Sequence, residues 1–489
     1  MRSPTLRLSW LALTATATIT AATPNLVAAG PLADAYEQAL SFDNSFNIAR
    51  QQLAIAAESP KLARAFLKPQ LNLVASISAV QQEITSDFFG GFDEEYIGWA
   101  AQLQLSGPVW HRELKAQINR GDNELAFAQL QFAAAGQSLI QRLINSYLDL
   151  LSAREEQKFA VARIEALNKE LSLIRSRYRA GSIARTDVDE ARARSDRAKA
   201  ALIDARTLVE TAEDAVLDIT GGLADTLPDV TEQLTLDSPK PASPSEWMQR
   251  AKTGNLAVLL SQQQEQLEQN AIDIARAEKS PRLDYSGQFG VSDQSDSIVG
   301  QRRVANEIQL QLTVPIYAGG RINSNVRRAE ASYSAQLATT RSELADVLKD
   351  TRRAFRNVEA VIRRNEALQT AIRSEKAALR ATRDGYRAGT RTIDDLLNSR
   401  VALLAAKRDA ALARYDYLRE SVALQQLAGE LDLSTLKRFD QLVTGGRRDA
   451  AAQLTAPASK LSSELYSEPQ APYSETGNAP FELELKKAR

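Results

Sequence analysis

The chain has 489 residues, with 60 basic and 61 acidic side chains and a formal net charge of −1. That balance removes the electrostatic basis for nucleic-acid binding, and the absence of cysteine excludes disulfides and thiolate metal sites. Aromatic residues make up only 6% of the chain, while Ala, Leu, Arg, Glu and Gln dominate. This composition is typical of long helices.

The N-terminal segment predicts an export signal. Arg2 and Arg7 give a basic start, an apolar stretch follows from Leu8, and small residues suitable for cleavage end at Ala29. No later run reaches the roughly 18 apolar residues that a membrane helix needs. We therefore expect residues 1–29 to be a signal peptide and the mature chain to be exported without a helical anchor.

The chain contains a long internal duplication. The phrase YRAGSIARTDV, from Tyr178, coincides with YRAGTRTIDDL, from Tyr386, when the sequence is shifted by 208 places. The same shift places Gly221 on Gly429 without a gap. We expect a disordered C-terminal tail and two structural repeats joined by a linker, with these bounds: repeats 30–222 and 247–442, linker 223–246, tail 443–489.

Each repeat contains two stretches in which apolar and polar residues alternate. The clearest is VANEIQLQLTV, where Val304, Ile308 and Leu310 face one way and polar residues face the other. Period two indicates strands, so we predict strand hairpins at about 69–107 and about 282–314. The strands suit a membrane β-barrel or, as an alternative, ordinary surface hairpins. Four strands cannot close a barrel, because known ones have at least eight, so several chains would share it.

Long helices follow the strands in both repeats, and a short helix precedes them, around Tyr36 and around Trp247. Apolar residues at heptad spacing, such as Ile140, Ile144 and Tyr147, are typical of a coiled-coil seam. In the two YRAG phrases a glycine supplies the left-handed residue that ends a helix. We predict two long helical hairpins with their turns at these glycines: hairpins at about 115–220 and about 320–430, turns at Gly181 and Gly389.

Across roughly residues 31 to 440 the sequence resembles the TolC family of outer-membrane efflux proteins. The segments that carry the resemblance are GYRAGTRTIDDLL and LTVPIYAGGRINSNVRRAE. The resemblance implies a mainly α-helical chain with a small membrane β part. In such a homotrimer, three chains pool four strands each into one outer-membrane β-barrel, and the long hairpins form a periplasmic α-barrel.

The resemblance also implies a function and partners. The function is a passive exit duct of a tripartite efflux or type I secretion system, in the outer membrane and with a large periplasmic part. The partners are outer-membrane lipid, a periplasmic adaptor and an inner-membrane transporter of the RND, ABC or MFS type. No cofactor is implied.

A gate at the closed helix tips is the most specific implication of the resemblance. Tyr386 would reach Asp187 of the neighbouring hairpin, and Arg391 would contact Thr186 and Asp187 across a chain boundary. The alternative is that these residues only cap helices and pair on the surface, as is common at helix turns.

A pore constriction is implied at the same tips. Asp395 would form an acidic ring of three. The second acidic ring of the family falls on Asn398, which departs from the pattern and would weaken the attraction of cations at the entrance.

Two other classes of protein are open from the sequence. An enzyme would need a nucleophile, base or metal cluster, but the chain has a single histidine, His111, and its carboxylates are spread over helix faces. We therefore expect no enzyme, cofactor or metal. A periplasmic adaptor would carry one long helical hairpin beside a compact β-rich domain, so the duplication favours the duct.

Overall fold

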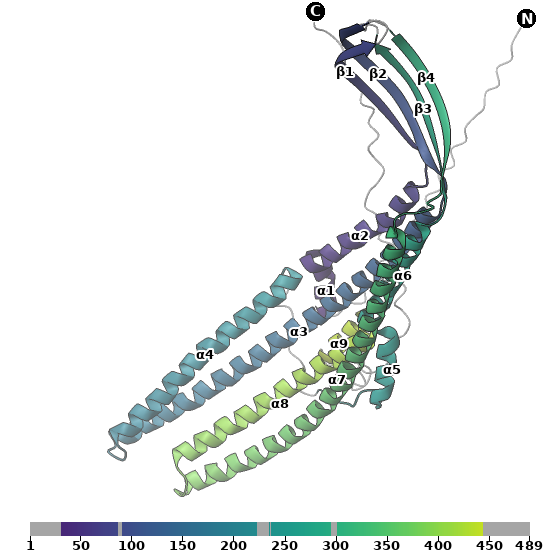
Figure 1. Cartoon of the computed structure of the whole chain (residues 1–489). Coiled ribbons are helices and arrows are strands. Elements are labelled where there is room, and N and C mark those ends of the chain that lie inside the picture. Colours follow the sequence, from purple (N-terminus) through teal and green to yellow (C-terminus); the bar gives the residue numbers. More distant parts are fainter. Residues whose placement is uncertain (1–30, 87–89, 223–233, 235, 295–300, 444–489) are drawn as a thin grey trace, which may run out of the picture.

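The computed structural model describes residues 31–86, 90–222, 234, 236–294 and 301–443. The molecule is elongated, with a small sheet at one end and two helical hairpins at the other (Figure 1). The expected signal peptide, residues 1–29, lies outside the described residues, as do half of the linker and nearly all of the tail. The described residues are mainly helical and include four strands, as the sequence predicted.

Each half begins with two helices in succession, whereas the sequence analysis expected one short helix. The second helix of each pair starts at a side chain that caps it. The Asp43 carboxylate accepts a hydrogen bond from the backbone N–H of Phe46, and the Asn255 side chain accepts from Ala257 and Val258. The four helices are α1 (Pro31–Phe42), α2 (Asn44–Ala65), α5 (Pro244–Gly254) and α6 (Leu256–Ala277).

The strands form one antiparallel sheet in the order β1-β2-β3-β4. One face is apolar across the sheet, because the register places Leu73 beside Leu103 and Leu103 beside Phe289. At Pro108 the second strand is bulged, which tolerates a residue without a backbone N–H. The strand therefore continues past the proline at which the predicted hairpin ended. The strands are β1 (Gln70–Ser86), β2 (Gly90–His111), β3 (Arg282–Gln294) and β4 (Gln301–Thr313).

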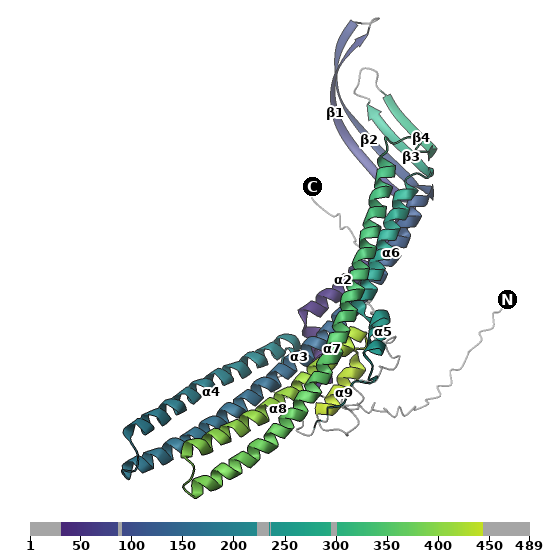
Figure 2. The same ribbon diagram turned by 60° about the horizontal axis from the view of Figure 1, so that its bottom comes forward.

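Two long helical hairpins follow the sheet and lie side by side (Figure 2). Their first helices have 68 and 67 residues, or about 100 Å each at 1.5 Å per residue. The heptad residues Ile140, Ile144 and Tyr147 are buried, as a seam requires. No described helix has a stretch that is long and apolar enough to cross a membrane. The hairpin helices are α3 (Arg112–Arg179), α4 (Arg185–Thr220), α7 (Arg321–Arg387) and α8 (Ile393–Ala428).

The main core lies midway along the molecule, where both hairpins meet the shorter helices. It includes the fully buried aromatic residues Tyr147, Trp247, Tyr417 and Phe439. Phe439 belongs to α9 (Leu433–Val443), a helix that the sequence analysis did not predict. The α9 helix also joins the two ends of the described chain, because the Asp440 carboxylate accepts hydrogen bonds from two backbone N–H groups at the start of α1.

Candidate functional site

The two hairpin tips are built in the same way. Gly181 and Gly389 have φ angles of 73° and 79°, the left-handed conformation that glycine adopts without strain. The next residue returns a hydrogen bond five positions back, from Ser182 to Arg177 at 3.0 Å and from Thr390 to Gly385 at 2.8 Å. This is the Schellman arrangement, which satisfies the last carbonyls of a helix and reverses the chain.

The helices that leave the two turns start differently. At the second tip, Thr392 and Asp395 form a reciprocal capping box, with hydrogen bonds of 3.0 and 3.1 Å. The Thr392 N–H and hydroxyl hold the pKa of Asp395 below its ordinary value. At the first tip the cap position is Ala184, whose methyl group cannot accept a hydrogen bond. Asp187, the counterpart of Asp395, is exposed and makes no side-chain hydrogen bond within the described chain.

Tyr386 links the two hairpins within one chain. Its hydroxyl accepts a hydrogen bond of 2.6 Å from the Arg177 guanidinium, which also lies 5.5 Å from the centre of the tyrosine ring. The expected hydrogen bond from Tyr386 to Asp187 is not formed within the single chain. The contact made by Arg177 was not predicted from the sequence, in which Arg177 comes one residue before the first YRAG phrase.

The other expected gate residues lie at the tips with exposed side chains. Thr186, Arg391 and Asn398 are all exposed, and none has a side-chain hydrogen bond in the described part of the single chain. Arg391 lies against Gly385, where an added Cβ would come within 2.8 Å of the arginine Cγ. The structure therefore brings Tyr386 to the first hairpin and leaves Arg391 and Thr186 without side-chain hydrogen bonds to any described residue of the chain.

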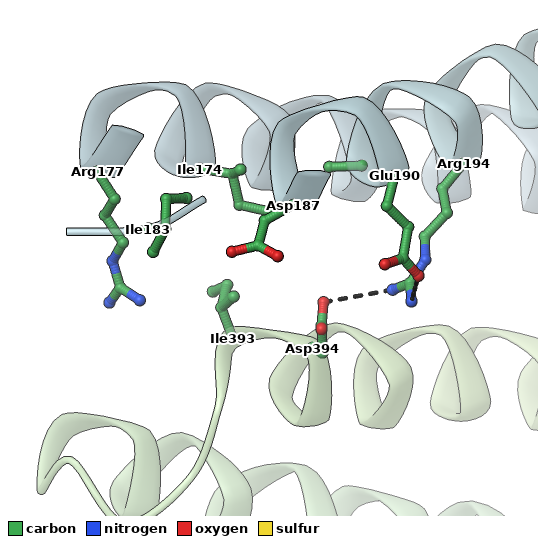
Figure 3. Close-up of a pocket in the computed structure, with 9 residues that line it drawn as sticks. Ile174, Arg177, Ile183, Asp187, Glu190, Arg194, Ile393 and Asp394 are labelled. Carbon is green, nitrogen blue, oxygen red and sulfur yellow. Dashed lines mark hydrogen bonds and ion pairs between the residues drawn. The ribbon is translucent and has the colours of Figure 1, made fainter. Parts of the chain in front are cut away.

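A groove lies between the first hairpin and the start of α8 (Figure 3). Ile174, Ile183 and Ile393 supply its apolar side chains. Charged side chains face one another across it, and Arg194 of α4 bridges Glu190 at 2.7 Å and Asp394 of α8 at 3.3 Å. The side chains around the groove thus connect the first hairpin with α8, by an ion pair as well as by apolar contact.

Glu170 of α3 interacts electrostatically with this ionic group and is only 3% exposed. Burial is the main cause that raises its pKa to about 7, and Asp394 beside it is the next. The sequence analysis did not single out Glu170. A signal was present, because Glu170 comes directly before Leu171 and four residues before Ile174, both buried in the same helix.

The single histidine has a structural role. The His111 imidazole accepts a 3.4 Å hydrogen bond from the backbone N–H of Leu114 and so caps the long helix α3. Among the described residues, no cluster of three or more His, Cys, Asp or Glu side chains is arranged to hold a metal ion.

The chain matches a family model described as outer membrane efflux protein over residues 35–222 and 247–430. The outer membrane protein TolC of Vibrio cholerae is 28% identical over 407 residues, which cover 82% of this chain and 91% of that protein. The alkaline protease secretion protein AprF of Pseudomonas aeruginosa is 26% identical, and the match covers 87% of this chain and 91% of AprF.

Solved structures of outer-membrane channels have the same fold. The CmeC outer membrane channel of Campylobacter jejuni superposes with a TM-score of 0.71 at 18% identity, covering 86% of this chain and 90% of CmeC. The outer membrane protein VceC of Vibrio cholerae gives 0.67 at 21% identity, covering 81% and 96%. The relatives are channels and secretion proteins, and none supports the adaptor alternative. This chain therefore belongs to the outer membrane efflux protein family and forms an exit duct in the outer membrane, with its helical part in the periplasm.

Proposed function

We propose that three copies of the chain assemble into one duct and close a shared barrel with their sheets. The observation that supports this most directly is the open sheet. β1 and β4 each lie at an edge of the four-stranded sheet, with one side unpaired among the described strands. In a membrane, unpaired backbone groups cost several kcal/mol each, so each edge needs the edge of another copy.

The apolar face of the sheet supports the same assembly. Leu73, Ile77 and Ile308 are 74–81% exposed in the single chain. Large side chains exposed over a whole sheet face indicate contact with lipid or protein. We propose that this face meets outer-membrane lipid and that the polar face lines the duct.

The test of assembly is the mass of the detergent-extracted protein, together with its conductance in planar bilayers. We expect a trimer that forms channels. A folded monomer with four membrane-spanning strands would contradict the proposal.

We propose further that the hairpin tips form the gate of the duct. Arg391 of one copy would pair with Thr186 and Asp187 of the next, since these side chains are exposed and make no side-chain hydrogen bond with the described residues of their own chain. Tyr386 would hold the two hairpins of one copy together through Arg177. The tips would then close by contacts both within and between copies.

Asp395 would line the constriction as a ring of three carboxylates, one turn away from Asn398. The capping box fixes the Asp395 side chain at the start of α8. A carboxylate held in place and ionised near a narrow entrance attracts cations.

We also propose a periplasmic adaptor and an inner-membrane pump as partners. AprF and PrtF are named for protease secretion, and OpmQ of Pseudomonas aeruginosa for pyoverdine export. These names indicate that a duct of this family exports a substrate that other components deliver to it. Co-purification of a periplasmic adaptor and an inner-membrane transporter with this chain tests the proposal, and a duct that exports without them would contradict it.

The expected processing remains a proposal. Residues 1–29 would be removed on export, and the tail after residue 443 would contribute neither pore nor assembly contacts. N-terminal sequencing of the mature protein and truncation after residue 443 test these two points.

A further inference from the structure

A buried carboxyl group lies at the contact between the two hairpin tips. Glu170, on α3, is 3% exposed, and its Oε1 atom has no hydrogen-bond partner within the described chain. A buried acceptor without a partner is destabilising, and more so when it is charged. An ionised Glu170 would thus be unfavourable at this place. The charges around it then determine whether it is protonated.

The surrounding charges come from two further helices. From α4, Glu190, Arg194 and Asp187 line the groove, and from α8, Asp394 does. Arg194 is the nearest cation, and it already bridges Glu190 and Asp394 (Figure 3). One arginine therefore faces three carboxyl groups close to one another, which favours the uptake of a proton.

One further charged residue, Arg177, lines the groove. Arg177, further along α3, donates to the Tyr386 hydroxyl instead. The α7 helix contributes none of the residues that line the groove. The position of Glu170 is not matched in the second repeat either, since its counterpart is Ala378 and the counterpart of Arg194 is Ala402.

We propose that Glu170, buried beside the ionic group of Asp394, Arg194 and Glu190, holds a proton when the two tips of a chain are in contact, and that loss of this proton favours their separation. Glu170 is then a proton-binding site that couples the state of the gate to periplasmic pH. The proposal rests on the gate described above. It adds a ligand, the proton, and the residue that takes it up.

The direction of the effect follows from where the proton binds. With the tips in contact, burial and the nearby Asp394 raise the pKa of Glu170 to about 7, from 4.5 in water. Separation exposes Glu170 and returns its pKa towards that ordinary value. The closed form therefore holds the extra proton between these two values, and it is progressively disfavoured as the pH rises through this window.

The expected size is set by the same linkage. One proton bound only in the closed form changes the ratio of closed to open tips by up to about tenfold per pH unit in each chain. Above the raised pKa, and below the ordinary one, the ratio becomes independent of pH. Acid should thus close the gate, and neutral or mildly alkaline conditions should loosen it.

The experiment measures the purified full-length assembly between about pH 4.5 and about pH 8. Single-channel conductance reports the open fraction. Spin labels report the separation of the hairpins, at Asp189→Cys on α4 and Arg387→Cys on α7, both exposed. The chain has no cysteine of its own, so labelling is specific. Mixing labelled chains with excess unlabelled chains leaves one labelled pair in each assembly.

The wild type should show more open channels and wider spin-label distances as the pH rises. Glu170→Gln keeps a neutral side chain at all pH values, so it should remain closed and lose the pH dependence. Asp394→Asn, at an exposed position, should shift the midpoint to lower pH because Glu170 loses a neighbouring negative charge. Glu165→Gln, on the exposed side of the same helix, is the matched control and should behave like wild type.

The outcomes separate the two proposals. Channels and tip distances that do not depend on pH in the wild type, or a Glu170→Gln variant that titrates like wild type, would overturn the proton site and leave the duct standing. A protein that assembles no channel at any pH would instead contradict the proposed assembly.

Discussion

The two hairpin tips have the same backbone but different side-chain chemistry. Both end α3 or α7 with a Schellman turn at an equivalent glycine. At the second tip, Thr392 caps its helix together with Asp395, whereas at the first tip Ala184 leaves Asp187 without that partner. The duplication thus preserved the turn, while single replacements decided which carboxylate bonds to its own backbone and which remains available to another hairpin.

A second difference concerns the contact between the hairpins. Arg177 reaches Tyr386, but the counterpart of Arg177 in the second repeat is Gly385, which has no side chain to reach Tyr178. Tyr178 is accordingly 43% exposed. Tyr386 therefore has an arginine partner in the first hairpin, whereas Tyr178 has no equivalent partner in the second. The hydrogen bond to a tyrosine hydroxyl thus links the two hairpins of one chain.

The largest effect is expected when both kinds of gate contact are removed. The double variant Tyr386→Phe with Arg391→Ser loses the link within the chain and the proposed link between chains. Exposed contacts are weak singly, so three copies should contribute roughly 1–3 kcal/mol, or about 5- to 150-fold in open channels. Single-channel recording measures this rise, and the assembly should keep its mass.

Tyr178→Phe is the matched control for that variant. The Tyr178 hydroxyl has no partner within the described chain, so the substitution should leave conductance unchanged. If the double variant conducts no better than wild type, these residues only cap and pair at the helix turns, and the gate lies elsewhere.

The second tip lacks the second acidic residue of the family pattern, because Asn398 stands at that position. Asn398→Asp adds a second ring of three carboxylates one turn from Asp395. Because several charges then act on one cation, we expect block by a multivalent cation from the periplasmic side to tighten by roughly tenfold. Titration of the bilayer current with the cation measures this. Asp395→Ala should weaken the block, and equal block in all three proteins would remove Asp395 from the constriction.

A substitution at Thr392 should break the capping box at the second tip. Thr392→Ala leaves the first N–H groups of α8 without their cap and should cost about 0.5–2 kcal/mol of helix stability. Amide hydrogen exchange in the first turn of α8 measures this local loss. Thr390→Ala, two residues earlier, is the control because its hydroxyl does not cap α8, and protection there should remain close to wild type.

The fold class and the tips could be predicted from sequence because their signals are local. Strand alternation has period two, heptads mark the long helices, and Gly181 and Gly389 end them. The short elements were harder. The α9 helix has only 11 residues, and what holds it is remote, since Asp440 bonds to the start of α1 more than 400 residues earlier.

The groove shows the same limit at the candidate site. Glu170 stands among the apolar residues of α3, but its partner Asp394 lies in the other repeat, and spacing along one helix does not reveal a pairing between hairpins. The expected contact of Tyr386 with Asp187 stays a prediction for the assembly, whereas within the described chain the Tyr386 hydroxyl accepts a hydrogen bond from Arg177. The family pattern did not indicate this contact, because Arg177 lies just before the duplicated phrase.

The smallest effect is expected when the first tip is made to resemble the second. Ala184→Thr places a cap three residues before Asp187, which creates the same Thr-x-x-Asp arrangement that the structure shows at Thr392 and Asp395. The new cap should stabilise the start of α4 by roughly 0.5–1 kcal/mol, measured by amide hydrogen exchange in its first turn.

The same substitution should weaken the gate although it strengthens the helix. Once Asp187 accepts a hydrogen bond from its own backbone, it is less available to Arg391 of the next copy, so open channels should increase by about 2- to 5-fold. Ala184→Val, which adds bulk without a hydroxyl, should do neither. A better-protected helix with unchanged conductance would show that Asp187 does not bond between chains, whereas opposite changes in the two measurements would identify the uncapped first tip as the side of the gate that receives its partner.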